Sequence, residues 1–179
     1  MYLSIITTMD VILFRHGIAV DAENWKADDA TRPLTPEGSV RTKQGAQGLS
    51  RLKVQPDHVF SSPLVRARQT ADLVKAQLAL KTKIELVDDL LPDAPPDALL
   101  ARLASLPARS VVLCVGHEPH LSTALSVMIS GKTAASIEMK KAAACGVGFI
   151  GLPKAGAGTL HWLLPPRILR VLGRSAAAS

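Results

Sequence analysis

Three short motifs place arginine and histidine side chains directly after strand-like runs of residues. Arg15, His16 and Gly17 follow the run VILF, and His117 follows the run VVLCVG. Between these two motifs, the segment SSPLVRARQ carries Arg66. Each arginine presents a planar fork of N–H donors that matches phosphate oxygens. Two guanidiniums and two imidazoles at one place would form a cationic, donor-rich cluster suited to a phosphate.

The motifs can meet only if the fold brings their strand ends together. In open α/β sheets, ligands lie beyond the carboxyl ends of the strands. Helices that begin beside such a site add the positive potential of their N-terminal amides. Buried strands are predicted at 11–14, 58–62, near 84–87 and at 110–117, and helices at 36–52, 63–79, 98–106 and from Pro119 onward.

This alternation of strands and helices predicts an α/β fold, a three-layer α/β/α sandwich around a central sheet. The segments CGVGFIGL and GTLHWLL, separated by PKAGA, predict a hairpin near the end of the chain. The sheet is therefore expected to be mixed but mostly parallel. Thr35 and Pro36 fit the N-cap and first position of a helix. Ala67, Ala71, Val74 and Leu78 recur at helical spacing and should face the sheet.

The length of 179 residues predicts a single domain, 1–179, with residues 1–8 as an extension before Met9 and residues 167–179 as a tail. Only 3% of the residues are aromatic, which argues against base stacking and a nucleic-acid partner. The net charge of +6 is spread along the chain, with one modest cluster in RILRVLGR. We interpret it as a solvated basic surface.

The two cysteines, Cys114 and Cys145, lie in apolar surroundings and are expected to be reduced core residues. The opening MYLSIITT lacks a basic region, and no apolar run is long enough to cross a bilayer. We therefore expect a cytoplasmic protein with no membrane partner, and a monomer. The segment HEPH is one residue short of the zinc-binding H-E-x-x-H pattern, so no metal site is expected. His120 is then expected to lie on a helix surface or to support the site.

In this order, RHG, SSPLVRARQTA and GHEP resemble the motifs of the histidine phosphatase superfamily, which has the phosphoglycerate mutase-like fold. RPLTPEG at 32–38 and LHWLLPP near the end are most similar to the short SixA-type phosphohistidine phosphatases. The resemblance spans the chain from about Asp10 to Pro166.

The resemblance implies that His16 is the nucleophile that accepts the phosphoryl group. It implies that Arg15, Arg66 and His117 bind the phosphate, with no metal or other cofactor. An imidazole that is neutral at pH 7 offers the required lone pair, and arginines stabilise the oxygens of the transferred group. A nearby dianionic phosphate would favour the protonated form of His117.

Four further residues border this predicted site. Gly17 is expected to leave room for the phosphate and the turn, and Arg32 either borders the substrate entrance or is an ordinary loop charge. Arg68 is two residues from Arg66 and so points to another side of the helix, into solvent. Thr70 shares a face with Arg66 and either holds its side chain or packs at the edge of the core. Trp25 either flanks the mouth of the site or anchors its loop.

The proton donor has no single candidate. The segment VDDLLPDAPPDA contains Asp88, Asp89, Asp93 and Asp97. A phosphohistidine leaves as imidazole, whose far nitrogen takes a proton from solvent, so its hydrolysis needs an internal acid less than that of an alkyl phosphate. The expected substrate is thus a histidine-phosphorylated protein. Two alternatives remain open: a small-molecule phosphomonoesterase or mutase of the same superfamily, and a phosphoprotein-binding module without catalysis.

Overall fold

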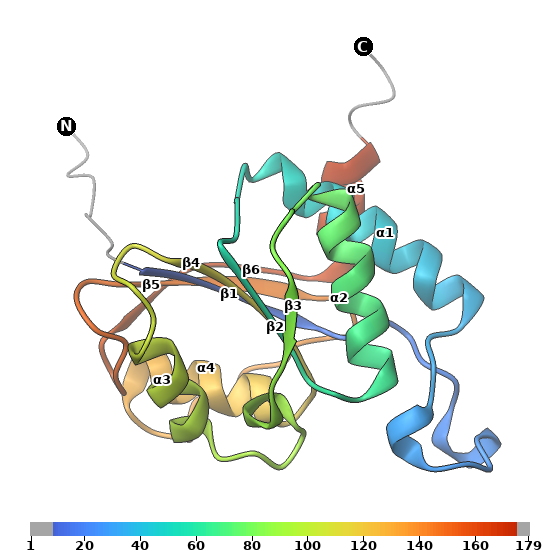
Figure 1. Ribbon diagram of the computed structural model, residues 1–179, viewed down its shortest axis with the longest axis horizontal. Coiled ribbons are helices and arrows are strands. Elements are labelled where there is room, and N and C mark those ends of the chain that lie inside the picture. The colour runs from blue at the N-terminus through green and yellow to red at the C-terminus, as the bar shows by residue number, and fades with distance from the viewer. Residues whose placement is uncertain (1–8, 175–179) are drawn as a thin grey trace.

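A six-stranded sheet forms the middle layer of the molecule in the computed structural model, which describes residues 9–174 (Figure 1). The expected extension, residues 1–8, lies outside the described residues. The strand order is β3-β2-β4-β1-β5-β6. The strands are β1 (Met9–Arg15), β2 (His58–Ser61), β3 (Ile84–Leu86), β4 (Val111–Gly116), β5 (Ala144–Phe149) and β6 (Gly158–Leu164).

Five of the six strands run in one direction and β5 runs in the opposite direction, which confirms the predicted mixed but mostly parallel sheet. β1 and β2 both pair with β4 in parallel, and β3 pairs with β2 in parallel. The predicted hairpin is β5 and β6, and β5 pairs antiparallel with β1. Arg15 is opposite Gly116, and Ser61 is opposite Val115. Strands β2, β4 and β1 are therefore neighbours whose carboxyl ends share one edge of the sheet.

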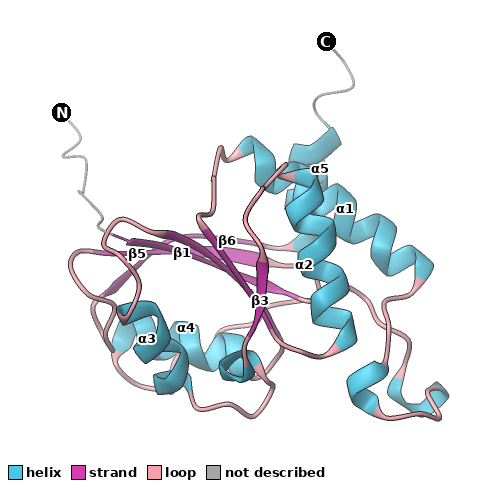
Figure 2. Cartoon of the chain, viewed as in Figure 1, coloured by secondary structure: helices cyan, strands magenta, loops and turns pink. Residues whose placement is uncertain are grey.

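Helices cover both faces of the sheet, as the predicted three-layer sandwich requires (Figure 2). One face carries α1 (Pro36–Arg51), α2 (Val65–Gln77) and α5 (Pro166–Arg174), and the other carries α3 (Pro96–Ala104) and α4 (His120–Ser130). Short 3-10 helices are η1 (Ala22–Asn24), η2 (Asp29–Thr31) and η3 (Asp88–Leu90). Within residues 9–174, no helix has the length and apolar character needed to cross a membrane.

The core divides into two layers because side chains alternate between the faces of a strand. Val11 and Leu13 of β1 pack in the cluster under α3 and α4, whereas Ile12 and Phe14 pack in the cluster under α1, α2 and α5. Cys114 and Cys145 are free and buried, as expected, and burial raises the pKa of the Cys145 thiol to about 12. The apolar run of β1 thus anchors the strand from both sides.

Helix starts follow the predicted signals closely. Thr35 caps α1, and its Oγ1 accepts a hydrogen bond from the Gly38 amide at 2.9 Å. The predicted stripe on α2 is buried, with Ala67, Ala71 and Val74 fully inaccessible. α2 begins two residues later than predicted, at Val65, and α3 runs two residues earlier, over Pro96–Ala104.

The expected tail is wrong for residues 167–174, which form most of α5. Leu169 is fully buried against α1. The two helices approach closely because glycines face the contact: a Cβ on Gly48 would lie 1.8 Å from the Leu169 carbonyl oxygen, and one on Gly173 would lie 2.6 Å from the Gln44 carbonyl oxygen. This contact depends on residues about 120 positions apart, which local patterning does not detect.

Replacing Gly48 with alanine should therefore destabilise the protein. The added methyl group has no space against a backbone oxygen, so we expect Gly48→Ala to lower the free energy of unfolding by about 1–3 kcal/mol. Gly45→Ala is the matched control, because the nearest atom to its added Cβ would be 3.9 Å away. It should be neutral or stabilising by up to about 1 kcal/mol. Urea unfolding of both variants tests this, and equal stabilities would contradict the packing argument.

Candidate active site

The structure brings the three predicted motifs together at one edge of the sheet. His16 follows β1, His117 follows β4, and Arg66 lies in the first turn of α2, after β2. The two imidazole rings lie with their centroids 4.9 Å apart, tilted by 52°. All three side chains are buried, with exposed fractions of 6% for His16, 1% for His117 and 4% for Arg66.

One ring nitrogen of His16 is occupied by a backbone contact. Nδ1 lies 2.7 Å from the Gly17 carbonyl oxygen. A carbonyl oxygen can only accept, so Nδ1 carries the proton and Nε2 keeps its lone pair. Burial lowers the pKa of His16 to about 3, with a further contribution from Arg66, Arg15 and Lys141. The ring is thus neutral at ordinary pH.

Gly17 lies in a tight backbone junction. Its amide donates to Thr70 Oγ1 at 3.0 Å, and the Thr70 hydroxyl donates to the Arg66 carbonyl oxygen at 2.8 Å. The missing side chain leaves room for Thr42, because a Cβ on Gly17 would lie 2.2 Å from Thr42 Oγ1. Thr70 therefore ties the end of β1 to α2, rather than holding the Arg66 side chain.

His117 is held by a serine at the end of β2. Its Nε2 lies 2.8 Å from Ser62 Oγ, which also accepts the Leu64 amide at 3.3 Å. Burial is the main cause that lowers the pKa of His117 to about 2, and the charges of His16 and Arg66 contribute to the same shift. Its Nδ1 is buried and has no partner within residues 9–174. That nitrogen is available to a ligand.

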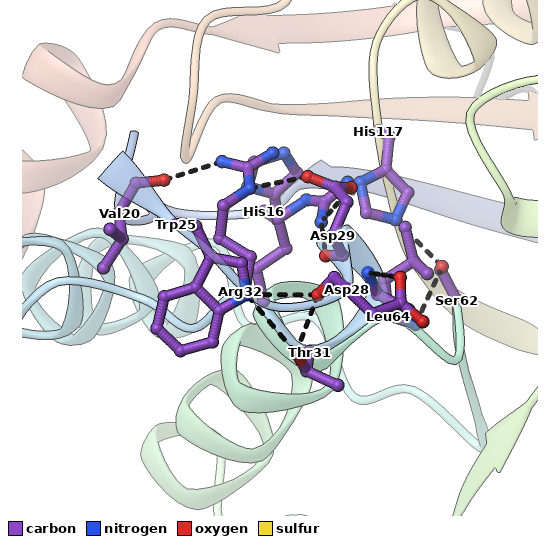
Figure 3. A network of polar contacts seen from close by, with 12 residues as sticks. His16, Val20, Trp25, Asp28, Asp29, Thr31, Arg32, Ser62, Leu64 and His117 are labelled. Atoms are coloured by element: carbon purple, nitrogen blue, oxygen red, sulfur yellow. Dashed lines mark hydrogen bonds and ion pairs between the residues drawn. The ribbon is translucent and has the colours of Figure 1, made fainter. Parts of the chain in front are cut away.

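The buried arginine is held by a carboxylate from the loop after β1. Arg66 NH1 lies 3.0 Å from Asp29 Oδ2 and donates to the Asp29 carbonyl oxygen at 2.9 Å. Arg32 Nε donates to Asp29 Oδ1 at 2.7 Å, and its NH1 donates to the Val20 carbonyl oxygen at 2.7 Å. The bond from Arg32 is the main reason why the pKa of Asp29 is lowered. Figure 3 shows Asp29 beside Arg32 and both histidines.

Nothing in the sequence motifs pointed to Asp29, although it stands three residues before Arg32 in DDATR. Trp25 anchors its loop, as one of the two predicted roles stated: the indole Nε1 donates to the Asp28 carbonyl oxygen at 3.1 Å (Figure 3). The Asp28 carboxylate accepts the Ala30 amide at 2.9 Å. These bonds fix the loop that presents Asp29 and Arg32 to the site.

Two further arginines differ in their exposure, and that of Arg68 was predicted. Arg68 is exposed, in contrast to Arg66 on the same helix. Arg15 is half-buried and donates from NH1 to the Met139 carbonyl oxygen at 2.7 Å. Its Nε is buried without a partner among the described residues. Burial lowers the pKa of Arg15, and Glu118 and Glu138 oppose that shift.

The predicted acid candidates lie outside this cluster of contacts. Asp88, Asp93 and Asp97 are exposed. Asp89 is half-buried and forms an ion pair with Arg102. Within residues 9–174, none of the four forms a hydrogen bond or ion pair with His16 or His117.

Two further polar side chains lie near the histidines. Glu118 follows His117 directly; its Oε2 accepts a hydrogen bond from Ser122, and its Oε1 is buried without a partner within the described range. One of the two predicted positions of His120, on a helix surface, is wrong, because only 2% of this residue is exposed. Within residues 9–174, no group of three His, Cys, Asp or Glu side chains is arranged to hold a metal ion.

We compared the sequence with protein families and with known proteins. A model of the histidine phosphatase superfamily (branch 1) matches residues 11–91. An uncharacterized protein from Picosynechococcus sp. is 36% identical over 174 residues, covering 88% of this chain and 100% of its own. The phosphohistidine phosphatase SixA of Escherichia coli is 30% identical over 166 residues, covering 91% of this chain and 98% of its own.

A solved structure of the protein histidine phosphatase SixA, complexed with tungstate, has the same fold. It is 28% identical, covers 90% of this chain and 99% of its own, and superposes with a TM-score of 0.78. The predicted phosphoglycerate mutase-like fold and the resemblance to SixA are thereby confirmed. The chain belongs to the histidine phosphatase superfamily.

Proposed function

We propose that this protein removes the phosphoryl group from a phosphohistidine on a partner protein, through a phospho-His16 intermediate. The observation that carries the proposal is the state of His16. Its Nδ1 is bound to the Gly17 carbonyl oxygen, and its ring is neutral, so Nε2 holds a free lone pair beside two arginines and a second imidazole. Similarity to SixA over nearly the whole chain supports this choice of reaction.

In the first step, Nε2 of His16 attacks the phosphorus atom. A bond forms between phosphorus and Nε2, and the bond between phosphorus and the partner's imidazole nitrogen breaks. The partner's ring leaves as neutral imidazole, since its far nitrogen takes a proton from solvent. In the second step, water attacks phospho-His16, the bond to Nε2 breaks, and inorganic phosphate leaves as the water proton passes to solvent.

The surrounding cations stabilise the charge on the phosphoryl oxygens in both steps. Arg15 and Arg66 stay charged and donate to these oxygens. His117 presents its unpartnered Nδ1 to the same group, and a bound dianionic phosphate raises the pKa of His117 and so favours its protonated form. Binding of the phosphate displaces the Asp29 carboxylate from Arg66, which frees the guanidinium fork. Tungstate, which the SixA structure holds, is a tetrahedral oxyanion like phosphate.

The choice of phosphohistidine over an ester rests on the proton donor. An alkoxide leaving group needs an acid close to the scissile bond. Asp29 has a lowered pKa and is bound by two arginines, so it is a poor acid. Asp89 is bound by Arg102. A phosphohistidine avoids this requirement because its leaving imidazole takes a proton from solvent.

The first prediction concerns the nucleophile and the substrate together. The wild-type protein should release phosphate from a histidine-phosphorylated carrier protein far faster than from small phosphomonoesters. His16→Ala should lower that release by at least about a thousandfold, since the residue that bonds to phosphorus is gone. Faster turnover of an ester would favour the phosphomonoesterase alternative. Binding of the phosphoprotein without any release would favour the binding module.

The second prediction uses two arginines of α2 as a matched pair. Arg66→Ala should lower kcat for phosphate release by about 10²- to 10³-fold, because a charged donor to the transition state is lost. Arg68→Ala, two residues away and exposed, should change kcat by less than about twofold. Circular dichroism confirms that both variants fold. Equal losses in the two variants would contradict the assignment of Arg66.

The third prediction follows from the low pKa of His16, about 3. NMR signals of its ring should not titrate between about pH 5 and pH 8, where an unperturbed histidine does. The signals are assigned by their absence in His16→Asn. A midpoint near pH 6.5 for His16 would contradict the proposed neutral nucleophile.

The same shift makes stability depend on pH. The unfolded chain binds a proton at His16 below about pH 6.5, and the folded protein does not until about pH 3. Stability should therefore fall as the pH drops through this range, by up to about 1.4 kcal/mol per pH unit for this residue. In His16→Asn, the free energy of unfolding should fall less over the same pH range.

A further inference from the structure

A groove opens beside the site, between the amino-terminal ends of α1 and α5 and the segment 138–142. It has a volume of about 560 Å³, and Arg15 lines it. Arg15 is also a proposed phosphate ligand, so the groove and the site share this residue. Its cationic lining residues are Arg15, Arg41, Lys140, Lys141, Arg167 and Arg170, against one carboxylate, Glu138. We call this surface the basic groove.

Carboxylates of the chain neutralise the basic groove only weakly. Arg41 pairs with Glu37 on α1 at 2.5 Å, and both side chains are about half exposed or more. Lys140 lies 3.9 Å from Glu138, and both are exposed. Exposed pairs of this kind contribute little to stability. The cations of these two pairs can therefore form ion pairs with the charges of another molecule.

The rest of the groove is a convergence of like charges. Arg167 and Arg170 form no ion pair with any residue in the described part of the chain. Burial lowers the pKa of Arg170, and Arg41, Arg174 and Arg167 lower it further. Lys141 contributes to the lowered pKa of His16, so the positive field of the groove reaches the nucleophile. Such a cluster carries an energetic cost that an anionic occupant would remove.

The lining also restricts the kind of anion. Ile18, Ala142 and Pro165 add apolar walls, which a bare phosphate would leave unused. Among the described residues that line it, none is aromatic, so it offers no platform for stacked bases. A short peptide segment that combines carboxylates with aliphatic side chains matches both the charge and the walls.

We propose that the basic groove docks an acidic segment of the phosphorylated partner protein, next to its phosphohistidine. This proposal rests on the proposed function, and it places selection of the partner outside the phosphate site. The cluster RILRVLGR, interpreted from the sequence as a solvated surface, is thereby given a role, because its Arg167 and Arg170 line the groove. They belong to α5, which lies beside α1 (Figure 1).

The test uses two synthetic phosphohistidine peptides that differ only in their flanks. One carries Asp and Glu among aliphatic residues, and the other carries Asn and Gln at the same positions. The variant is Lys140→Glu/Arg167→Glu, in which two exposed groove cations are reversed. The control, Lys81→Glu/Lys83→Glu, makes the same change of charge at exposed positions before β3.

The wild type and the control should prefer the acidic peptide by about tenfold or more in kcat/KM, mainly through KM, and lose this preference at high salt. The groove variant should lose the preference while keeping its rate on the neutral peptide within about twofold. No preference in the wild type, or equal losses in both variants, would overturn the proposal. A fall in kcat/KM of the groove variant on both peptides would also overturn the proposal, since the groove cations would then act on the phosphate itself.

A binding arm separates this proposal from the proposed function. Fluorescence anisotropy compares the two peptides without their phosphoryl group, together with a single-stranded oligonucleotide and anionic vesicles. If neither phosphopeptide is hydrolysed, the proposed function fails, but groove-dependent binding of the acidic peptide would still support docking. Stronger groove-dependent binding of the oligonucleotide or the vesicles would contradict the choice of a protein segment.

Discussion

The hydrogen bond between His16 Nδ1 and the Gly17 carbonyl oxygen, at 2.7 Å, is the contact on which the site depends. It fixes the proton on one nitrogen of the ring and leaves the lone pair on the other. Burial keeps that lone pair available, because it disfavours the charged ring and outweighs the hydrogen bond to Gly17, which raises the pKa of His16. The cost is that a polar ring and an arginine must be buried with few partners. The donors and acceptors of these side chains that have no protein partner are then available to a ligand.

The sheet supplies the position of that contact, and small polar side chains supply its orientation. Parallel pairing of β1 and β2 with β4 brings His16, His117 and Ser62 to one edge. The Thr70 hydroxyl then bonds both the Gly17 amide and the Arg66 carbonyl oxygen, so it links the backbone beside the nucleophile to the backbone of α2. Above them, the loop of Asp29 holds Arg66 and Arg32 in place until an anion competes for their donors.

Much of this arrangement was predictable because its signals are local. Apolar runs and helical periodicity gave the strands and most helices, and the rule on strand ends brought RHG, Arg66 and GHEP together. The features that were missed depend on distant contacts. α5 packs closely on α1 because Gly48 of α1 and Gly173 of α5 leave room for the contact, and Asp29 contacts Arg66 across 37 residues. The basic groove gathers Arg41, Lys140 and Arg167 from three separate segments, so composition alone showed only dispersed charge.

In the proposed reaction, His16 accepts the phosphoryl group on Nε2. The most direct measurement traps the phosphoenzyme in a single turnover, using protein labelled with ¹⁵N histidine and a phosphohistidine donor, and records ³¹P–¹⁵N coupling. We expect one phosphoryl signal, coupled to Nε2 of His16 and absent in His16→Asn. A phosphoryl group on Nδ1 or on His117, or phosphate release without any phosphoenzyme, would contradict it.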